Sequence, residues 1–158
     1  RETLFNWLQY DLEDSVCIDL FSGSGALGFE AASRGAKKVH MIDNDSDVVK
    51  CLKDNKDELK VENVTLYNTN AEDFIKNFKD KVDLIFLDPP FSKNIINIII
   101  HYLSLSQIFN DKCKIYIEVQ LQKNLEEVIY KPKSWELLKS SKSGDVAYLL
   151  YQHNNSMI

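Results

Sequence analysis

The chain has 158 residues, of which 44% are apolar, enough for one well-packed domain and short for two. Its 19 Lys and Arg residues are outnumbered by 24 Asp and Glu residues, which argues against a broad basic surface for nucleic acid. The apolar stretch at residues 95–100 is far shorter than the ~20 residues of a membrane span, and the first residues do not form a signal peptide. We therefore expect one domain over residues 1–158, in the cytoplasm and away from membranes.

The cysteines and histidines show no catalytic or metal-binding arrangement. Cys17, Cys51 and Cys113 are far apart and odd in number, and no CxxC or Cys/His cluster is present. Neither a disulfide framework nor a zinc site is expected, and three reduced thiols fit a cytosolic protein. The histidines share no spacing and are expected on a strand, a helix and a tail: His40, His101 and His153.

The first part of the chain alternates between helix and strand. Residues 3–10 carry apolar side chains at helical spacing. Residues 16–20 form a short apolar run that ends at glycines, which predicts a buried strand. Residues 26–34 are rich in helix formers and are followed by Gly35, which is typical of a helix C-terminus.

The middle of the chain continues the same alternation. Residues 38–42 predict a second strand, residues 46–60 a polar helix, and residues 63–67 a third strand. Asn70 predicts the N-cap of another helix, and residues 82–87 predict a fourth strand. Because these strands are nearly continuously apolar and are separated by helices, they indicate a parallel sheet covered on both faces.

The C-terminal third departs from this alternation. Residues 114–119 predict a fifth strand and residues 121–129 a helix. Residues 135–140 and 145–151 then flank the Ser-Lys-Ser-Gly sequence at 141–144, a spacing typical of a β-hairpin. We expect an α/β domain with a mostly parallel seven-stranded sheet and a C-terminal antiparallel hairpin strand, the Rossmann-like fold of class I methyltransferases.

A glycine turn follows the first predicted strand. Residues 23–28, Gly-Ser-Gly-Ala-Leu-Gly, match the GxGxxG pattern and open a helix. Asp43, at the end of the next strand, is placed to accept hydrogen bonds from two ribose hydroxyls. This pattern indicates a nucleoside cofactor without deciding which one, since nicotinamide enzymes share it. The cofactor-binding residues predicted around these two positions are Phe21, Ser22, Gly23, Ser24, Gly25 and Asn44.

Asp19 favours S-adenosyl-L-methionine over a dinucleotide. An acid just before the glycine turn would oppose a pyrophosphate, but it suits an ammonium or sulfonium group. The alternative interpretation is a carboxylate that only stabilises the turn. Asn70 and Ala71 follow the third strand and would lie beside an adenine ring, and Asn70 can cap a helix at the same time.

Asp88, Pro89, Pro90 and Phe91 follow the fourth strand and form the candidate catalytic motif. Ligands of open α/β sheets bind beyond the carboxyl ends of the strands, so the motif lies beside the glycine turn if the first and fourth strands are neighbours. The Asp88 carboxylate and the Pro89 carbonyl can accept both N–H groups of a base amine and stabilise the positive charge that develops on its nitrogen. Asp88 can then take or relay the released proton.

The rest of the motif suits the same task. Pro89 and Pro90 restrict φ and lack N–H donors, so their carbonyls can face a substrate. Phe91 would stack on an extruded base, an interaction worth about 1–3 kcal/mol. The competing interpretation is a proline-rich turn with Phe91 in the core. The position directly after a strand favours a methyltransferase that acts on a base amine.

With these residues, the chain resembles the bacterial 16S ribosomal RNA guanine-N2 methyltransferases of the RsmD type over nearly its full length. The resemblance rests on residues 1–8, 19–31, 33–36 and 88–91, and on residues 146–148 with 151–152. It implies S-adenosyl-L-methionine as cofactor and the N2 amine of a guanine in 16S rRNA as acceptor. It also implies an assembled or assembling 30S subunit as partner, and a monomer without metal.

The chain departs from the family pattern at two places. Asp43 stands where the family usually has glutamate, and an aspartate can still reach a ribose. Family members also carry a further N-terminal segment with a basic β-hairpin that contacts RNA. This chain lacks an initiating methionine, and we expect it to begin just after that segment, which would account for its acidic charge.

Other functions stay open at this point. An N6-adenine methyltransferase acting on DNA or RNA would use the same acid-Pro-Pro-aromatic motif. A nicotinamide-dependent oxidoreductase is favoured only by the glycine pattern and Asp43, and the sequence has no Tyr-x-x-x-Lys pair. A non-catalytic rRNA-binding module would not require Asp88. The lysines around Trp135 indicate either a solvated hairpin or an RNA contact: Lys131, Lys133, Lys139 and Lys142.

Overall fold

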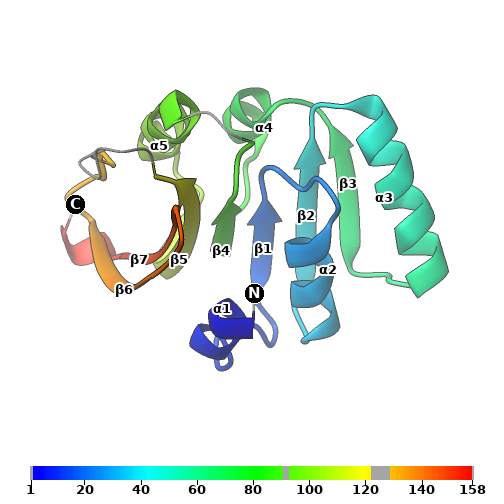
Figure 1. The fold of residues 1–158 in the computed structure, drawn as a ribbon, viewed down its shortest axis with the longest axis horizontal. Helices are drawn as coiled ribbons and strands as arrows, with labels where there is room; N and C mark the ends of the chain where they lie inside the picture. Colours follow the sequence, from blue (N-terminus) through cyan, green and yellow to red (C-terminus); the bar gives the residue numbers. More distant parts are fainter. Residues whose placement is uncertain (1, 91–92, 122–128, 158) are drawn as a thin grey trace.

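The computed structural model describes residues 2–90, 93–121 and 129–157, and its elements follow the predicted alternation (Figure 1). The helices are α1 Glu2–Trp7, α2 Ala26–Ser33, α3 Ser46–Leu59, α4 Ala71–Asn77, α5 Lys93–Leu105 and the 3-10 helix η1 Asn155–Met157. The strands are β1 Val16–Asp19, β2 Lys38–Asp43, β3 Val64–Asn68, β4 Val82–Leu87, β5 Phe109–Gln120, β6 Trp135–Ser143 and β7 Val146–His153. In these ranges, no helix is long and apolar enough to cross a membrane.

The described strands form a seven-stranded sheet in the order β3-β2-β1-β4-β5-β7-β6. The first five strands of this order run parallel, whereas β7 is antiparallel to both β5 and β6. The predicted mostly parallel sheet with an antiparallel C-terminal hairpin is therefore confirmed. Because β1 and β4 are neighbours, the strand order reverses between them, and their carboxyl ends form the crevice where open α/β sheets bind ligands.

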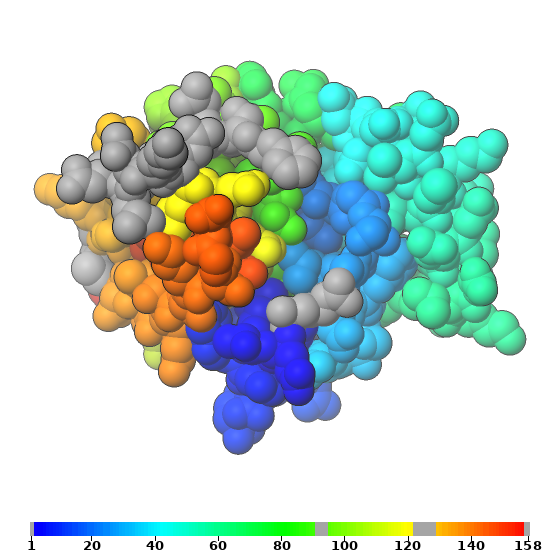
Figure 2. Space-filling model, in the orientation of Figure 1, coloured from blue at the N-terminus to red at the C-terminus, as the bar shows by residue number. Residues whose placement is uncertain are grey.

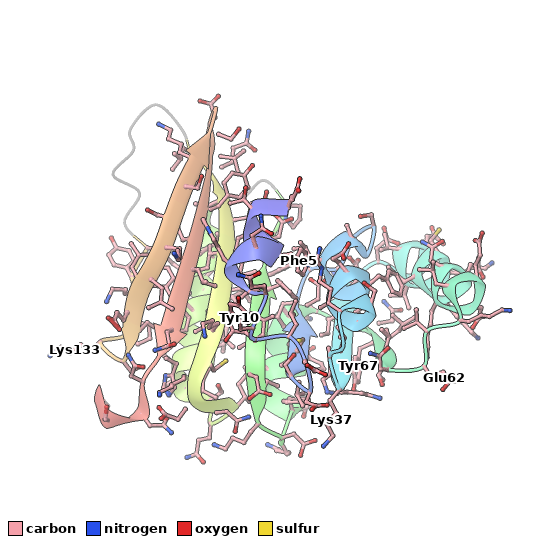
Figure 3. All side chains as sticks on the ribbon, turned by 90° about the horizontal axis from the view of Figure 1, so that it is seen from below. Phe5, Tyr10, Lys37, Glu62, Tyr67 and Lys133 are labelled. Carbon is pink, nitrogen blue, oxygen red and sulfur yellow. The ribbon has the colours of Figure 1, made fainter. Side chains whose placement is uncertain are left out.

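Helices cover both faces of this sheet. Helices α4 and α5 pack on one face, where Phe74 and Ile99 join the same buried cluster as Ile85 and Ile115. Helices α1, α2 and α3 pack on the other face. Phe5 of α1 points toward the sheet (Figure 3), and its ring centroid lies 6.3 Å from that of Phe86. Each central strand contributes to two cores, which explains its nearly continuous apolar sequence.

Some element boundaries differ from the predictions. Strand β5 begins at Phe109, earlier than residue 114, because Phe109 still pairs with Val82 of β4. A register shift separates this pair from the next one, Leu84 with Lys114. Strand β7 extends to His153, so this histidine is buried in a strand and does not lie in a tail. Residues 122–128 lie outside the described part of the chain, so the helix at 121–129 stays a prediction.

Candidate functional site

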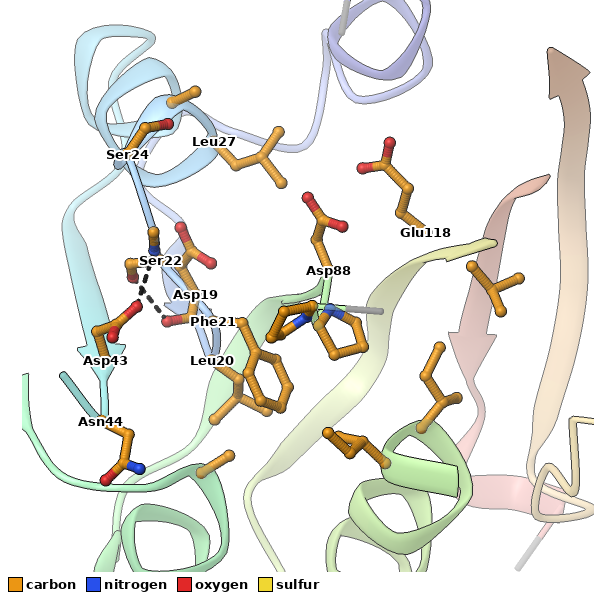
Figure 4. A pocket seen from close by; sticks show the side chains of 18 of the residues that line it. Asp19, Leu20, Phe21, Ser22, Ser24, Leu27, Asp43, Asn44, Asp88 and Glu118 are labelled. Carbon is orange, nitrogen blue, oxygen red and sulfur yellow. Dashed lines mark hydrogen bonds between the residues drawn. The ribbon is translucent and has the colours of Figure 1, made fainter. Parts of the chain in front are cut away.

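A cavity of about 960 Å³ opens at the carboxyl ends of the central strands. The loops after β1, β2, β3 and β4 line it, together with the ends of β5 and β7 that face each other. Figure 4 shows Asp43 and Asn44 on one side, Asp88 and Glu118 on the other, and Asp19 between them. In the space-filling view, the end of β5 (yellow) lies beside the β6–β7 hairpin (orange) (Figure 2).

This cavity brings together most of the predicted site residues, although they come from segments far apart in the sequence. Gly25 packs behind the turn and is not among the lining residues. Phe91 lies outside the described residues, so its stacking role stays a prediction. The predicted residues that line the cavity are Asp19, Phe21, Ser22, Gly23, Ser24, Asp43, Asn44, Asn70, Ala71, Asp88, Pro89 and Pro90.

The turn after β1 needs glycine at two positions for different reasons. Gly23 has φ +51°, and no atom lies within 4 Å of a Cβ placed there, so this residue leaves the cavity side of the turn bare. Gly25 has φ +86°, and a Cβ there would lie 2.5 Å from the Phe29 ring and 2.7 Å from Leu52. Gly25 therefore allows α2 to pack closely, whereas Gly23 allows a ligand to approach the backbone.

Asp19 is a buried carboxyl group at the end of β1, with only 1% of its surface exposed. Its Oδ2 atom accepts a hydrogen bond from the Gly28 N–H at 3.2 Å, while Oδ1 has no partner among the described residues. Burial raises the pKa of Asp19 to about 7; the Gly28 N–H opposes this rise and the charge of Asp88 adds to it. A buried carboxylate oxygen without a partner would be stabilised by a cationic ligand group.

Asp43 closes β2 and is held by backbone donors. Its Oδ2 accepts from the Gly23 N–H at 3.0 Å, and its Oδ1 accepts from the Asp45 N–H at 2.9 Å. Each oxygen keeps a free lone pair, because a carboxylate offers about four acceptor positions. The Asn68 side chain donates to the carbonyls of Asp43 and Asn44, both at 3.2 Å. The loop therefore presents a fixed pair of acceptors to the cavity.

Asn70 is confirmed as the N-cap of α4. Its Oδ1 accepts from the Asp73 N–H at 2.7 Å, and its Nδ2 donates to the Asp73 carboxylate at 3.1 Å. Ala71, the first residue of α4, is buried in the cavity wall. The cap fixes the loop after β3 at the edge of the cavity, so its wall is rigid on this side.

The first residues of the acid-Pro-Pro-aromatic motif extend β4 into the cavity. Asp88 and Pro89 are half-buried and Pro90 is exposed. Burial raises the pKa of Asp88, and a hydrogen bond with Glu118 opposes that rise. Neither proline carries an N–H group, so these two positions add no backbone donor to the cavity wall. The motif thus reaches the same cavity as the glycine turn, as predicted for neighbouring first and fourth strands.

Glu118 is a cavity residue that the sequence analysis missed. The β4–β5 register pairs Leu87 with Ile117, so the next residues, Asp88 and Glu118, come opposite each other. Burial, together with the charge of Asp88 and a hydrogen bond to it, raises the pKa of Glu118 to about 7. The available signal was an acid within the apolar run at residues 115–119. An acid at the end of an apolar run is also the signal that marks Asp19.

The cavity is rich in acceptors, and this limits what it can bind. Carboxyl groups from β1, β2, β4 and β5 line it, so it suits ligands that carry a positive charge or several N–H and O–H donors. In the described part of the chain, no group of three or more His, Cys, Asp or Glu side chains is arranged to hold a metal ion.

Known proteins are similar to this chain in sequence and in fold. A family model described as Conserved hypothetical protein 95 matches residues 1–152. A protein of Haemophilus influenzae named ribosomal RNA small subunit methyltransferase D is 40% identical over 157 residues, which cover 97% of this chain and 79% of that protein. The chain belongs to the RsmD-type family. The RsmD-type protein of the same name from Escherichia coli is 38% identical and is matched over 75% of its length.

Solved structures extend this RsmD-type likeness to three dimensions. The Escherichia coli protein yhhF superposes with a TM-score of 0.90 at 36% identity, covering 97% of this chain and 85% of that one. A structure from Haemophilus influenzae has a TM-score of 0.87 at 39% identity, with coverages of 98% and 96%. The family resemblance and the Rossmann-like methyltransferase fold predicted from the sequence are both confirmed.

Proposed function

We propose that this protein transfers the methyl group of S-adenosyl-L-methionine to the N2 amine of a guanine in 16S rRNA. Relatives named ribosomal RNA small subunit methyltransferase D support an rRNA substrate. The observation that carries the proposal is a single cavity that joins the glycine turn and Asp43 to Asp88 and Pro89. A cofactor and an acceptor base can therefore meet in one space, which is what a direct transfer requires.

The residues on the β1 and β2 side fit S-adenosyl-L-methionine. The unpartnered Oδ1 of Asp19 would accept a hydrogen bond from the methionine ammonium, and the free lone pairs of Asp43 would accept from the two ribose hydroxyls. Gly23 leaves room for the ligand at the turn, and Asn70 and Ala71 border the space for an adenine ring. When bound, the cofactor supplies a methyl group that its sulfonium charge makes electrophilic.

The residues on the β4 side fit an exocyclic amine. The nitrogen of such an amine is a poor nucleophile because its lone pair is conjugated into the base. Asp88 and the Pro89 carbonyl would accept its two N–H groups, turn the lone pair toward the methyl group, and stabilise the positive charge that develops. Asp88 would then accept or relay the proton that leaves nitrogen. Phe91 would stack on the base once it is extruded.

The substrate we propose is the RNA of an assembled or assembling 30S subunit, met by a monomeric single-domain protein in the cytoplasm. A small-subunit substrate is consistent with the names of the relatives. The target guanine would be unpaired or flipped out, because a base inside a helix cannot reach a cavity at the carboxyl ends of the strands.

Transfer of tritium from labelled S-adenosyl-L-methionine tests this proposal. We would offer 30S subunits that lack the modification, free 16S rRNA, tRNA and duplex DNA to the wild type and to an Asp88→Ala variant. We expect label only in the ribosomal substrates, and only with the wild type. Label in tRNA or DNA at equal or higher rates would contradict the proposed substrate. Equal rates for the two proteins would contradict the role of Asp88.

A further inference from the structure

Three side chains form a row across the sheet on the β4–β5 side of the cavity, which we call the acceptor side because the methyl-accepting base would enter there. The register of β4 with β5 brings Asp88 opposite Glu118, and the register of β5 with β7 pairs Glu118 with Tyr148. Figure 4 shows the Asp88 and Glu118 carboxyl groups side by side in the cavity. Glu118 lies in β5, which is hydrogen-bonded to β4 on one side and to β7 on the other, so the sheet holds its backbone in place. The cavity thus contains two adjacent carboxyl groups, although one carboxylate is enough to bind an amine. The second carboxyl group is available for another contact with the base.

Guanine and adenine differ beside the amine that would be methylated. Guanine presents N1–H next to its N2 amine, so this part of its Watson–Crick edge consists of donors. Adenine presents an unprotonated N1 next to its N6 amine, so an acceptor stands beside the donors. A carboxylate can accept from a guanine N1–H, whereas it repels the lone pair of an adenine N1. A second carboxylate beside the amine-binding one therefore separates the two bases by hydrogen bonding.

We propose that Glu118 is the residue that selects guanine, by accepting the N1–H of the base while Asp88 and the Pro89 carbonyl hold its N2 amine. This inference rests on the proposed function, because it assumes that the base enters at the Asp88 side of the cavity. It adds a contact that the acid-Pro-Pro-aromatic motif cannot provide, since that motif serves guanine and adenine amines equally.

The empty site and the occupied site would differ in protonation. Asp88 faces Glu118 from β4, Tyr116 and Tyr148 flank it on β5 and β7, and Asp19 lies beyond Asp88 on β1. Asp88 and burial raise the pKa of Glu118 to about 7, so the empty pair retains a proton near neutral pH. When guanine binds, its N–H groups would donate hydrogen bonds to the two carboxylates, and the shared proton would be released. Binding of guanine should therefore strengthen as the pH rises through 7.

Short competitor RNAs test the selection directly. The competitors are hexamers of uridine with one central guanosine, inosine or 2-aminopurine ribonucleoside, and the measured quantity is the inhibition constant against methylation of 30S subunits. Guanosine and inosine carry N1–H, whereas 2-aminopurine keeps the 2-amine but has a bare N1. A hydrogen bond to a charged group is worth about tenfold or more in affinity. At pH 8, above the pKa of about 7 for Glu118, we expect the wild type to favour guanosine over 2-aminopurine by at least that factor.

A matched pair of variants tests whether Glu118 selects the base or only supports the structure. Glu118→Gln keeps the shape, but its amide can pair with either kind of N1, so the preference for guanosine over 2-aminopurine should fall to within about threefold. Glu136→Gln makes the same change on an exposed part of β6 and should keep the wild-type ratio. The rise in guanosine affinity between pH 6 and pH 8 should also flatten in Glu118→Gln only.

An unchanged ratio of inhibition constants in Glu118→Gln would overturn the inference. Its failure can be told apart from a failure of the proposed function through the methylated nucleoside. If the wild type forms N2-methylguanosine and the ratio does not change, only the role of Glu118 is wrong. If the wild type methylates another base, the proposed function itself is wrong.

Discussion

The two sides of the cavity are built in different ways. On the β1–β2 side, both oxygens of Asp43 already accept backbone N–H groups, and the glycine turn is fixed by its own hydrogen bonds. On the β4–β5 side, Asp88 and Glu118 face each other, and burial raises the pKa values of both carboxyl groups. The first side is a rigid frame of acceptors, whereas the second is crowded with like charges.

This difference matches two tasks. A rigid frame suits a cofactor that is the same in every turnover, because each contact can be preorganised. A crowded pair of carboxyl groups is unfavourable when empty and becomes favourable when N–H donors arrive, which suits selection of a base. If this account is correct, variants on one side should change cofactor affinity and variants on the other should change transfer.

Asp88→Ala should have the largest effect. We expect it to lower kcat by at least about 10³-fold, because it removes both the acceptor for the amine and the proton acceptor. The dissociation constant of S-adenosyl-L-methionine, measured by calorimetry, should stay within a few-fold of the wild type. An equal loss of both quantities would mean that Asp88 shapes the cofactor pocket, and the division between the two sides would fail.

Asp43→Ala should have the opposite effect: it should weaken cofactor binding and leave kcat nearly unchanged. Loss of two hydrogen bonds to a charged group should weaken cofactor binding by about 10-fold to 100-fold, with kcat at saturating cofactor nearly unchanged. Asp45→Ala is the matched control, because Asp45 caps α3 and its loss should cost about 1 kcal/mol of stability without changing affinity. Wild-type affinity in Asp43→Ala would rule out its ribose contact.

Substitutions of the two turn glycines, Gly23 and Gly25, separate ligand binding from packing on the β1–β2 side, where we propose that the cofactor binds. Gly25→Ala forces a Cβ against Phe29 and Leu52, so we expect the free energy of unfolding to fall by about 2 kcal/mol. Gly23→Ala meets no atom and should cost only about 1 kcal/mol for its positive φ, while it lowers cofactor affinity. Urea denaturation and calorimetry measure the two effects. Equal stability losses would show that the packing argument for Gly25 is wrong.

Asp19→Asn should change the stability of the cofactor-free protein in a way that depends on pH. Burial raises the pKa of Asp19 from the ordinary value of 3.8 to about 7 in the folded protein. The folded protein therefore keeps a proton that the unfolded chain releases, and stability falls as the pH rises from about 4 to 7. Asparagine cannot titrate, so the variant should gain about 2–3 kcal/mol relative to the wild type between pH 5 and pH 8. A difference that stays constant over this range, in thermal melts without cofactor, would contradict the pKa assignment.

The sequence alone predicts the cofactor side better than the acceptor side. The glycine turn, Asp19 and Asp43 are readable because each lies at a strand end within one short segment, and the Asn70 cap depends only on its own helix. Glu118 was not recognised, because its role appears only when β5 is placed in register against β4, a contact between distant segments. The start of β5 was missed for a similar reason, since Phe109 pairs with Val82 of β4 across a register shift and polar residues separate it from the apolar run that follows.

The identity of the methylated nucleoside tests the central claim most directly. The 16S rRNA from 30S subunits treated with the wild-type protein and S-adenosyl-L-methionine would be digested to nucleosides and analysed by mass spectrometry against untreated subunits. We predict a gain of N2-methylguanosine and of no other methylated nucleoside. A gain of N6-methyladenosine would contradict the account, since it would mean that the carboxyl pair at Asp88 and Glu118 does not select guanine.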